Sequence, residues 1–293
     1  MKIKSRLITS YRRFRKMAAR WSGTDFPLNS IPSKELQQVI LKNREALAAV
    51  DDWLPRQLME HSVFNYGINP DVAPLLNLPL DRECTHTDVL AGYGVMMKGR
   101  CKYLEIGVSV GKTLWQILNT CAPCECWAFD IEEINPVLKQ RLTEVSRTEW
   151  QGPPGSLKKT PSSISRFVHP ATNGHLVYIC ADVFDQRAWE TLAGNKFNLV
   201  LSDALHTPQA IDFEWTQMTA ARIFNPHEIV LLWDDLDGEM KDWFNGKRET
   251  IAKELSVGIH NVRTGFVNGW LGRREFPHRF GFAVKWPSTG GAL

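Results

Sequence analysis

One stretch of the chain combines glycines, an acid and a basic–hydroxyl pair at a spacing that could hold a ligand. Residues 103–113 read YLEIGVSVGKT, an apolar strand that leads into a glycine turn and then a helix. Gly107 and Gly111 allow a tight turn and a close approach to a ligand, because glycine has no Cβ atom. The free N–H groups at the start of the following helix add hydrogen-bond donors. The pattern predicts a ligand site at this turn.

The spacing of these residues decides between ligand classes. A dinucleotide fingerprint, Gly-x-Gly-x-x-Gly, fails because Ser109 and Lys112 replace its second and third glycines. A phosphate-binding P-loop has its Gly-Lys-Thr end, but Ile106 stands where its first glycine is required. What remains is Glu-x-Gly-x-x-x-Gly, beginning at Glu105. This acid would repel a pyrophosphate and suits the cationic end of a ligand that carries an amino acid.

Acids also follow the next predicted strands. Asp130 lies at the end of the strand 126–131, where a carboxylate could accept hydrogen bonds from both ribose hydroxyls, and Asp182 follows the strand 175–180. With these motifs at successive strand ends, residues 86–286 resemble the class I S-adenosylmethionine-dependent methyltransferases. The resemblance implies that Asp130 binds the ribose and that Asp182 sits beside the adenine. The cofactor-binding residues that it implies are Glu105, Gly107, Ser109, Gly111, Asp130 and Asp182.

A second group of acids follows two further strands. Asp203 ends the strand 197–202, and the pair Asp234 and Asp235 ends the strand 228–233. Such acids would converge above the sheet, and three close carboxylates favour a hard cation such as magnesium. The pattern resembles the metal-dependent O-methyltransferases of the macrocin type, in which an Asp and a following Asp-Asp pair hold the metal. The alternative is that Asp234 and Asp235 only cap the next helix.

The chain departs from that family at one position. The family commonly reads Asp-Gly-Asp-His, whereas this sequence reads Asp-Ala-Leu-His over residues 203–206, so Leu205 replaces an acid that is a proposed base in some members. His206 stands next to the gap, and its ordinary pKa suits proton removal. The sequence therefore predicts His206 and Asp203 as catalytic residues, with Asp203 positioning the acceptor through the metal. A histidine that caps a helix or lies in the core is the alternative.

The elements that position these residues alternate between strand and helix. This alternation predicts an α/β fold, a doubly wound Rossmann-like methyltransferase sheet with a terminal antiparallel strand and a helical N-terminal extension. A helix is expected over 136–148. The segment 146–174 is too long for an ordinary connection, so it is expected to be disordered or to form a lid. Further strands are predicted at 102–106, 258–266 and 279–286, and helices at 112–121, 186–192, 209–223 and 243–255.

Residues 1–85 are predicted to form the extension and residues 86–293 the methyltransferase domain. Residues 1–20 hold basic residues and no acid, so they are either a solvated tail or an amphipathic helix on an anionic membrane surface or on phosphates. From Ser33 a helix is expected, with an N-cap serine and one apolar face. That face consists of Leu36, Val39, Ile40, Leu47 and Val50.

Composition and charge exclude several classes. With 43% hydrophobic and 23% charged residues, the chain lacks the profile of a disordered or coiled-coil protein. A net charge of +3 is too small for binding nucleic acid over the whole surface. The cysteines, including the dense run 121–126, predict buried thiols in a reducing cytoplasm rather than disulfides or a zinc ribbon. No run reaches the roughly 18 apolar residues of a membrane span.

These observations favour one function over two rivals. We expect transfer of a methyl group from S-adenosylmethionine to an oxygen on a small-molecule or sugar acceptor. A nucleic-acid methyltransferase is disfavoured, because the sequence has no Asn-Pro-Pro-Tyr or Asp-Pro-Pro-Tyr motif. A catalytically silent protein that binds only the cofactor or a partner is the second rival, and Leu205 is the feature that favours it.

Overall fold

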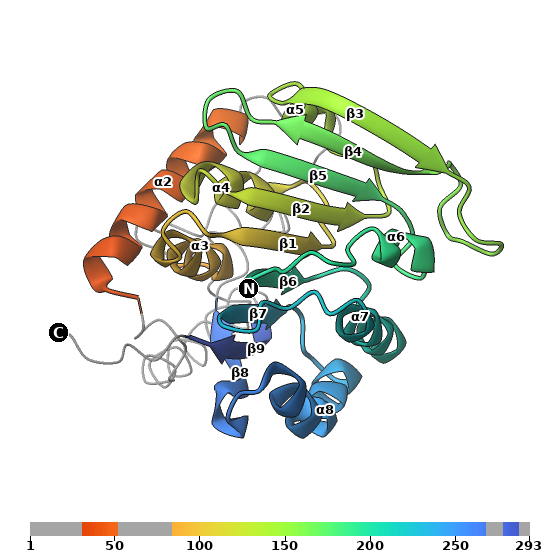
Figure 1. The fold of residues 1–293 in the computed structure, drawn as a ribbon. Coiled ribbons are helices and arrows are strands. Elements are labelled where there is room, and N and C mark those ends of the chain that lie inside the picture. Colours follow the sequence, from red (N-terminus) through yellow and green to blue (C-terminus); the bar gives the residue numbers. More distant parts are fainter. Residues whose placement is uncertain (1–30, 52–83, 268–277, 287–293) are drawn as a thin grey trace, which may run out of the picture.

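The computed structural model describes residues 31–51, 84–267 and 278–286, which fold around one large sheet (Figure 1). The helices are α2 (Ser33–Asp51), α3 (His86–Met96), α4 (Lys112–Thr120), α5 (Pro136–Lys139), α6 (Gln186–Glu190), α7 (Pro208–Ala220) and α8 (Glu239–Leu255), with a 3-10 turn at Ile259–Asn261. The strands are β1 (Lys102–Ile106), β2 (Glu125–Asp130), β3 (Thr143–Trp150), β4 (Ser162–Val168), β5 (His175–Cys180), β6 (Leu199–Ser202), β7 (Ile229–Trp233), β8 (Val262–Val267) and β9 (His278–Lys285).

The sheet has nine strands in the order β3-β4-β5-β2-β1-β6-β7-β9-β8. The central five, from β5 to β7, are parallel, and the pairs β7–β9 and β8–β9 are antiparallel. The chain winds outward from β1 to β2 and β5, then returns to β6 on the other side of β1. This is the doubly wound α/β class predicted from the sequence, with its terminal antiparallel strands, and that prediction is confirmed. The reversal of strand order lies between β1 and β6, where open α/β sheets bind ligands.

Helices cover both faces of the sheet because its central strands are apolar on both sides. Alternate residues of β1 show the division: Tyr103 packs in the core shared with α2, α3 and α4, whereas Leu104 and Ile106 pack in the core shared with α6, α7 and α8. All five residues of β7 are buried. The ends of the parallel strands are thereby held at one rigid edge.

The segment after α5 differs from the prediction. The expected helix over 136–148 is wrong beyond its first turn, because α5 ends at Lys139 and β3 begins at Thr143. Of the two alternatives for 146–174, disorder is wrong, because β3 pairs with β4 and β4 pairs with β5, all antiparallel. The connection between β3 and β4 reaches the cavity through Leu157, in the direction that the lid alternative predicted. The β-branched residues of β3 suit a strand, and seven of its eight residues are exposed at the edge of the sheet.

The helix α2 packs on the main body, as predicted. Asn43 and Arg44 both donate hydrogen bonds to the buried carboxylate of Asp88 on α3, and the Trp115 indole donates to the Ala46 carbonyl. The predicted tail and amphipathic helix within residues 1–20 lie outside the described residues. Cys121, Cys124 and Cys126 are buried, and none of them forms a disulfide. Within the described ranges, no helix combines the length and apolar character of a membrane span.

Candidate functional site

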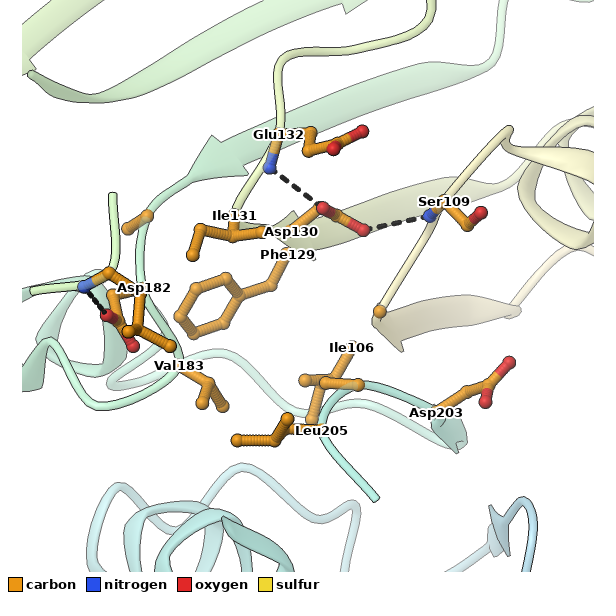
Figure 2. A pocket seen from close by; sticks show the side chains of 14 residues that line it. Ile106, Ser109, Phe129, Asp130, Ile131, Glu132, Asp182, Val183, Asp203 and Leu205 are labelled. Carbon is orange, nitrogen blue, oxygen red and sulfur yellow. Dashed lines mark hydrogen bonds between the residues drawn. The ribbon is translucent and has the colours of Figure 1, made fainter. Parts of the chain in front are cut away.

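A cavity of about 430 Å³ opens at the carboxyl ends of the parallel strands, beside the switch point between β1 and β6 (Figure 2). Its volume lies within the range of small-ligand pockets. Figure 2 shows Asp182 and Val183 on one side of it, with Ser109 and Asp203 on the other. The lining residues are Ile106, Gly107, Ser109, Phe129, Asp130, Ile131, Glu132, Leu157, Ala181, Asp182, Val183, Asp203, Ala204 and Leu205.

Gly107 joins the two halves of this site. Its φ of +83° is a left-handed conformation that favours glycine, and a Cβ atom there would lie 2.0 Å from the Asp203 carbonyl oxygen. Its N–H donates to the Phe129 carbonyl at 2.8 Å. The glycine therefore brings the end of β1 against both β2 and β6. Gly111 immediately precedes α4, as its place before a helix predicted, and is not among the residues that line the cavity, so its cofactor contact stays a prediction.

The carboxylate of Asp130 fixes the turn after β1. Its Oδ2 atom accepts the N–H groups of Val108 at 2.5 Å and Ser109 at 2.8 Å, and its Oδ1 atom accepts the N–H of Glu132 at 2.8 Å. A carboxylate has about four lone-pair positions, so one acceptor position remains. Asp130 lines the cavity, and its predicted role as the ligand of both ribose hydroxyls stays a prediction.

Asp182 occupies the equivalent position after β5. Its Oδ1 atom accepts the Phe184 N–H at 3.0 Å, while Oδ2 accepts the Ser156 hydroxyl at 3.0 Å and the Leu157 N–H at 2.7 Å. Ser156 and Leu157 belong to the connection between β3 and β4, and sequence reasoning missed both. Their only signal is their place in a connection rich in Pro, Ser and Lys.

Glu105 lies in β1 one residue before Ile106, which lines the cavity. The side chain is buried and accepts a hydrogen bond of 2.8 Å from the Tyr103 hydroxyl. Burial raises the pKa of Glu105 well above its ordinary value, and the hydrogen bond from Tyr103 opposes that shift. Glu105 is not among the described lining residues, and its predicted contact with a cationic ligand group stays a prediction.

His206 lies between two of the predicted acids. Its Nε2 atom is 3.1 Å from Asp203 Oδ1, and its Nδ1 atom is 3.2 Å from Asp235 Oδ2. The Nε2 contact is a hydrogen bond and the Nδ1 contact is an ion-pair distance, so a protonated ring attracts both carboxylates. The hydrogen bond with Asp203 raises the pKa of His206 to about 9. The sequence predicted a ring that takes up a proton, whereas this geometry favours a ring that already holds one at neutral pH.

The acids around this ring repel one another. Burial, followed by the charge of Asp234, raises the pKa of Asp203 to about 8, and the hydrogen bond with His206 acts in the opposite direction. Asp234 is buried, and its Oδ1 atom accepts the N–H of Asp235 at 2.6 Å. Asp235 has a left-handed backbone, with φ of +50°. We refer to Asp203, His206, Asp234 and Asp235 as the acidic cluster.

The acidic cluster does not fit the predicted magnesium ion. Within the described residues, no three His, Cys, Asp or Glu side chains form a group that could hold a metal ion. The His206 ring instead stands between Asp203 and Asp235 and supplies positive charge to them. The three predicted acids thus lie near His206, whose ring contacts Asp203 and Asp235.

One buried acid near this cluster escaped sequence analysis. Glu214 on α7 is 1% exposed, and the Ser202 hydroxyl donates to its Oε2 atom at 2.6 Å. Burial raises the pKa of Glu214 to about 7. The sequence contains a signal for this burial, because Glu214 lies on the same helix face as the apolar residues Ile211, Trp215 and Met218. Glu214 thus stabilises the strand end that carries Asp203.

Comparisons with known proteins give distant similarities only. No family model matches the chain, and no curated protein does. Among solved structures, it is similar to an O-methyltransferase from Bacillus cereus in complex with SAH, at 12% identity, with 87% of this chain and 91% of that chain covered and a TM-score of 0.41. It is also similar to the cofactor-bound protein Rv0187 from MTB, at 14% identity, 82% and 97% coverage and a TM-score of 0.39. A SAM-dependent methyltransferase from Agrobacterium tumefaciens matches at 16% identity, 68% and 61% coverage and a TM-score of 0.37. At these identities and TM-scores the similarities carry no argument about activity.

Proposed function

We propose that this chain is an S-adenosylmethionine-dependent methyltransferase that methylates a hydroxyl of a small-molecule or sugar acceptor. One observation carries the proposal: the carboxylates of Asp130 and Asp182, at the ends of β2 and β5, line the same cavity as Asp203 at the end of β6. The sequence motifs that resemble methyltransferases end at these strands. The proposal thus rests on the order of the strands in the sheet and on the three carboxylates at their ends.

The cavity suits the chemistry of the cofactor. Asp130 retains an acceptor position for a ribose hydroxyl, and Asp182 retains one for an amine of the base. Apolar side chains line the wall between these acids, where a flat purine can be buried. They are Ile106, Phe129, Ile131 and Val183.

When bound, S-adenosylmethionine supplies a methyl group whose bond to a sulfonium sulfur breaks as the acceptor oxygen attacks. The protein has to align the acceptor and remove its proton. Asp203 lines the cavity, and its raised pKa makes it a stronger base than an ordinary aspartate. The ionised form of Asp203, whose fraction grows as the pH rises toward about 8, therefore accepts the hydroxyl proton, and His206 holds this carboxylate in place and offsets its charge. No step is assigned to a metal ion.

Calorimetric titration with S-adenosylhomocysteine tests this proposal, with magnesium present and absent. We expect saturable micromolar binding by the wild type in both conditions. Asp130→Ala should weaken it by about 10-fold to 100-fold, since a charge-assisted hydrogen bond contributes roughly 1.5–3 kcal/mol. Asn135→Ala is the matched control, because Asn135 also caps a backbone N–H after β2, at 2.9 Å from Val137, but does not line the cavity.

The outcomes separate the proposal from its rival. Binding that is lost in Asp130→Ala and kept in Asn135→Ala supports the cofactor, and methyl transfer to a panel of hydroxylated acceptors then supports the reaction. Normal binding without turnover on any acceptor would favour the catalytically silent protein. An absence of binding by the wild type would contradict the proposal.

A further inference from the structure

The connection between β3 and β4 returns to the cavity from the edge of the sheet. Trp150 at the end of β3 pairs with Ser162 at the start of β4, and Ser163 pairs with Cys180 at the end of β5. The connection 151–161 therefore leaves the sheet at the same edge as Asp182. This register explains how an insertion distant in sequence reaches the ligand end of β5.

Both ends of this connection are fixed to one buried acid. The Trp150 indole donates to Asp185 Oδ2 at 2.9 Å, and the Ser162 hydroxyl donates to the same oxygen at 3.3 Å. Asp185 is 3% exposed and also caps α6 through the Arg187 N–H. The base of the connection is thus attached to the segment that follows Asp182.

The tip of the connection contacts Asp182 directly. The Ser156 hydroxyl and the Leu157 N–H occupy Oδ2 of Asp182, and the Phe184 N–H takes one position on Oδ1. Three donors leave about one acceptor position, and Asp182 lines the cavity. A carboxylate held in this way accepts one further N–H and repels a carbonyl oxygen.

The Leu157 side chain adds an apolar surface to the same place. It lines the cavity although it is 62% exposed. A flat ring placed against Val183 would remove part of this side chain from water, which is favourable in proportion to the apolar area covered. The hairpin tip therefore offers both a polar and an apolar contact.

We infer that Ser156 and Leu157 complete a recognition site for a 6-aminopurine, in which Ser156 orients Asp182 toward the exocyclic amine and Leu157 covers the ring. The inference rests on the proposed function and deepens it, because it assigns the selectivity for the base to a hairpin that sequence analysis did not foresee. Ser156 acts as a positioning residue, and Leu157 contacts the ligand.

Titration with two ligands tests the assignment of Ser156. S-adenosylhomocysteine carries the amine, and S-inosylhomocysteine carries a carbonyl oxygen in its place. The wild type should prefer the amine by about 10-fold to 100-fold, since an unmatched buried polar group costs roughly 1–3 kcal/mol. Ser156→Ala should reduce this preference by about 3-fold to 10-fold, whereas Ser146→Ala, on the exposed strand β3 of the same hairpin, should keep it.

Leu157→Ala should weaken both ligands equally, by about 3-fold to 10-fold, because the ring is covered whichever group it carries. Val145→Ala is its control, since Val145 is a 64% exposed apolar side chain on β3 and does not line the cavity. Trypsin gives an independent readout at Lys158 and Lys159. S-adenosylhomocysteine should slow cleavage there at least about 5-fold in the wild type, because a ligand that packs against Leu157 stabilises the folded tip.

Unchanged preference in Ser156→Ala, together with unchanged affinity in Leu157→Ala and no protection from trypsin, would overturn the inference. If S-adenosylhomocysteine still binds and Asp130→Ala still loses it, the proposed function survives that result. Failure of the wild type to bind S-adenosylhomocysteine would instead remove the proposed function, and this inference with it.

Discussion

The two sides of the cavity hold their acids in opposite ways. On the side of β2 and β5, the carboxylates of Asp130 and Asp182 accept backbone N–H groups from the turns beside them. On the side of β6 and β7, Asp203 and Asp235 are held by the ring of His206, which is itself ionisable. The first side is fixed by donors that do not titrate. The second side depends on the proton content of its own members.

The difference matches what each side is proposed to do. A cofactor has the same polar groups in every turnover, so fixed backbone donors can orient the acids that bind it. A site that removes a proton needs a group whose affinity for that proton lies near the working pH. Raised pKa values of about 8 for Asp203 and about 9 for His206 provide this on one side only.

The largest expected effect comes from breaking the junction between the two sides. Gly107→Ala should destabilise the protein by about 3–5 kcal/mol, because it combines left-handed backbone strain with a Cβ atom 2.0 Å from the Asp203 carbonyl oxygen. Gly194→Ala is the matched control, since Gly194 has φ of +82° and a Cβ atom added there would meet nothing within 4 Å. It should cost only about 1–2 kcal/mol. Urea denaturation measures both, and equal losses would show that the close approach of β1 to β6 is not required.

An intermediate effect should appear in the pH dependence of stability. The folded pKa values of Asp203 and His206 lie above the ordinary values of about 3.9 and 6.5, so both groups stabilise the fold when protonated. The contribution of Asp203 is fully present below about pH 3.9 and is lost as the pH rises to about 8. The contribution of His206 is fully present below about pH 6.5 and is lost as the pH rises to about 9. Because the His206 side chain is 42% exposed, solvent screens much of its interaction with the carboxylates. We therefore expect the free energy of unfolding to fall by only roughly 1 kcal/mol between pH 6.5 and 9.5.

Asp203→Asn should flatten that dependence, because it removes one titrating group and the main cause of the shift at the other. The pKa of His206, followed by NMR, should fall toward its ordinary value in this variant. Asp237→Asn is the control, as Asp237 follows the same strand as the Asp234–Asp235 pair but is 72% exposed and pairs with Arg279. If the free energy of unfolding of Asp203→Asn depends on pH as steeply as that of the wild type, the side of β6 and β7 does not depend on the protonation of Asp203 and His206.

The same comparison shows which features could be predicted from the sequence. The parallel strands could, because they are short apolar runs, four of which end in an acid or have one within the next two residues, and β7 is buried at every residue. The strand ends then follow from topology, since parallel strands place their carboxyl ends at one edge. Asp130, Asp182 and Asp203 were therefore found as lining residues without any knowledge of their contacts.

The hairpin and the proton states could not be predicted in this way. The residues of β3 are mostly polar and exposed, so no periodic pattern distinguishes them from a helix or a loop. The contact of Ser156 with Asp182 depends on the register of β4 against β5, which local sequence does not encode. Whether His206 accepts or already holds a proton depends on two carboxylates from different strands.

The smallest expected effect on stability comes from Leu205, which lines the cavity beside Asp203. Leu205→Ala should change the free energy of unfolding by less than about 0.5 kcal/mol, because the side chain is already 40% exposed. Affinity for S-adenosylhomocysteine should stay within about twofold, since the Asp130 and Asp182 contacts remain. Leu205→Asp sharpens the comparison, because it adds a carboxylate next to Asp203. This variant should raise the pKa of His206 and make the free energy of unfolding depend more steeply on pH. Cofactor affinity should stay unchanged. Denaturation at pH 6.5 and 9.5 and calorimetry would measure these effects, and a large loss of cofactor affinity in either variant would show that the two sides of the cavity are not independent.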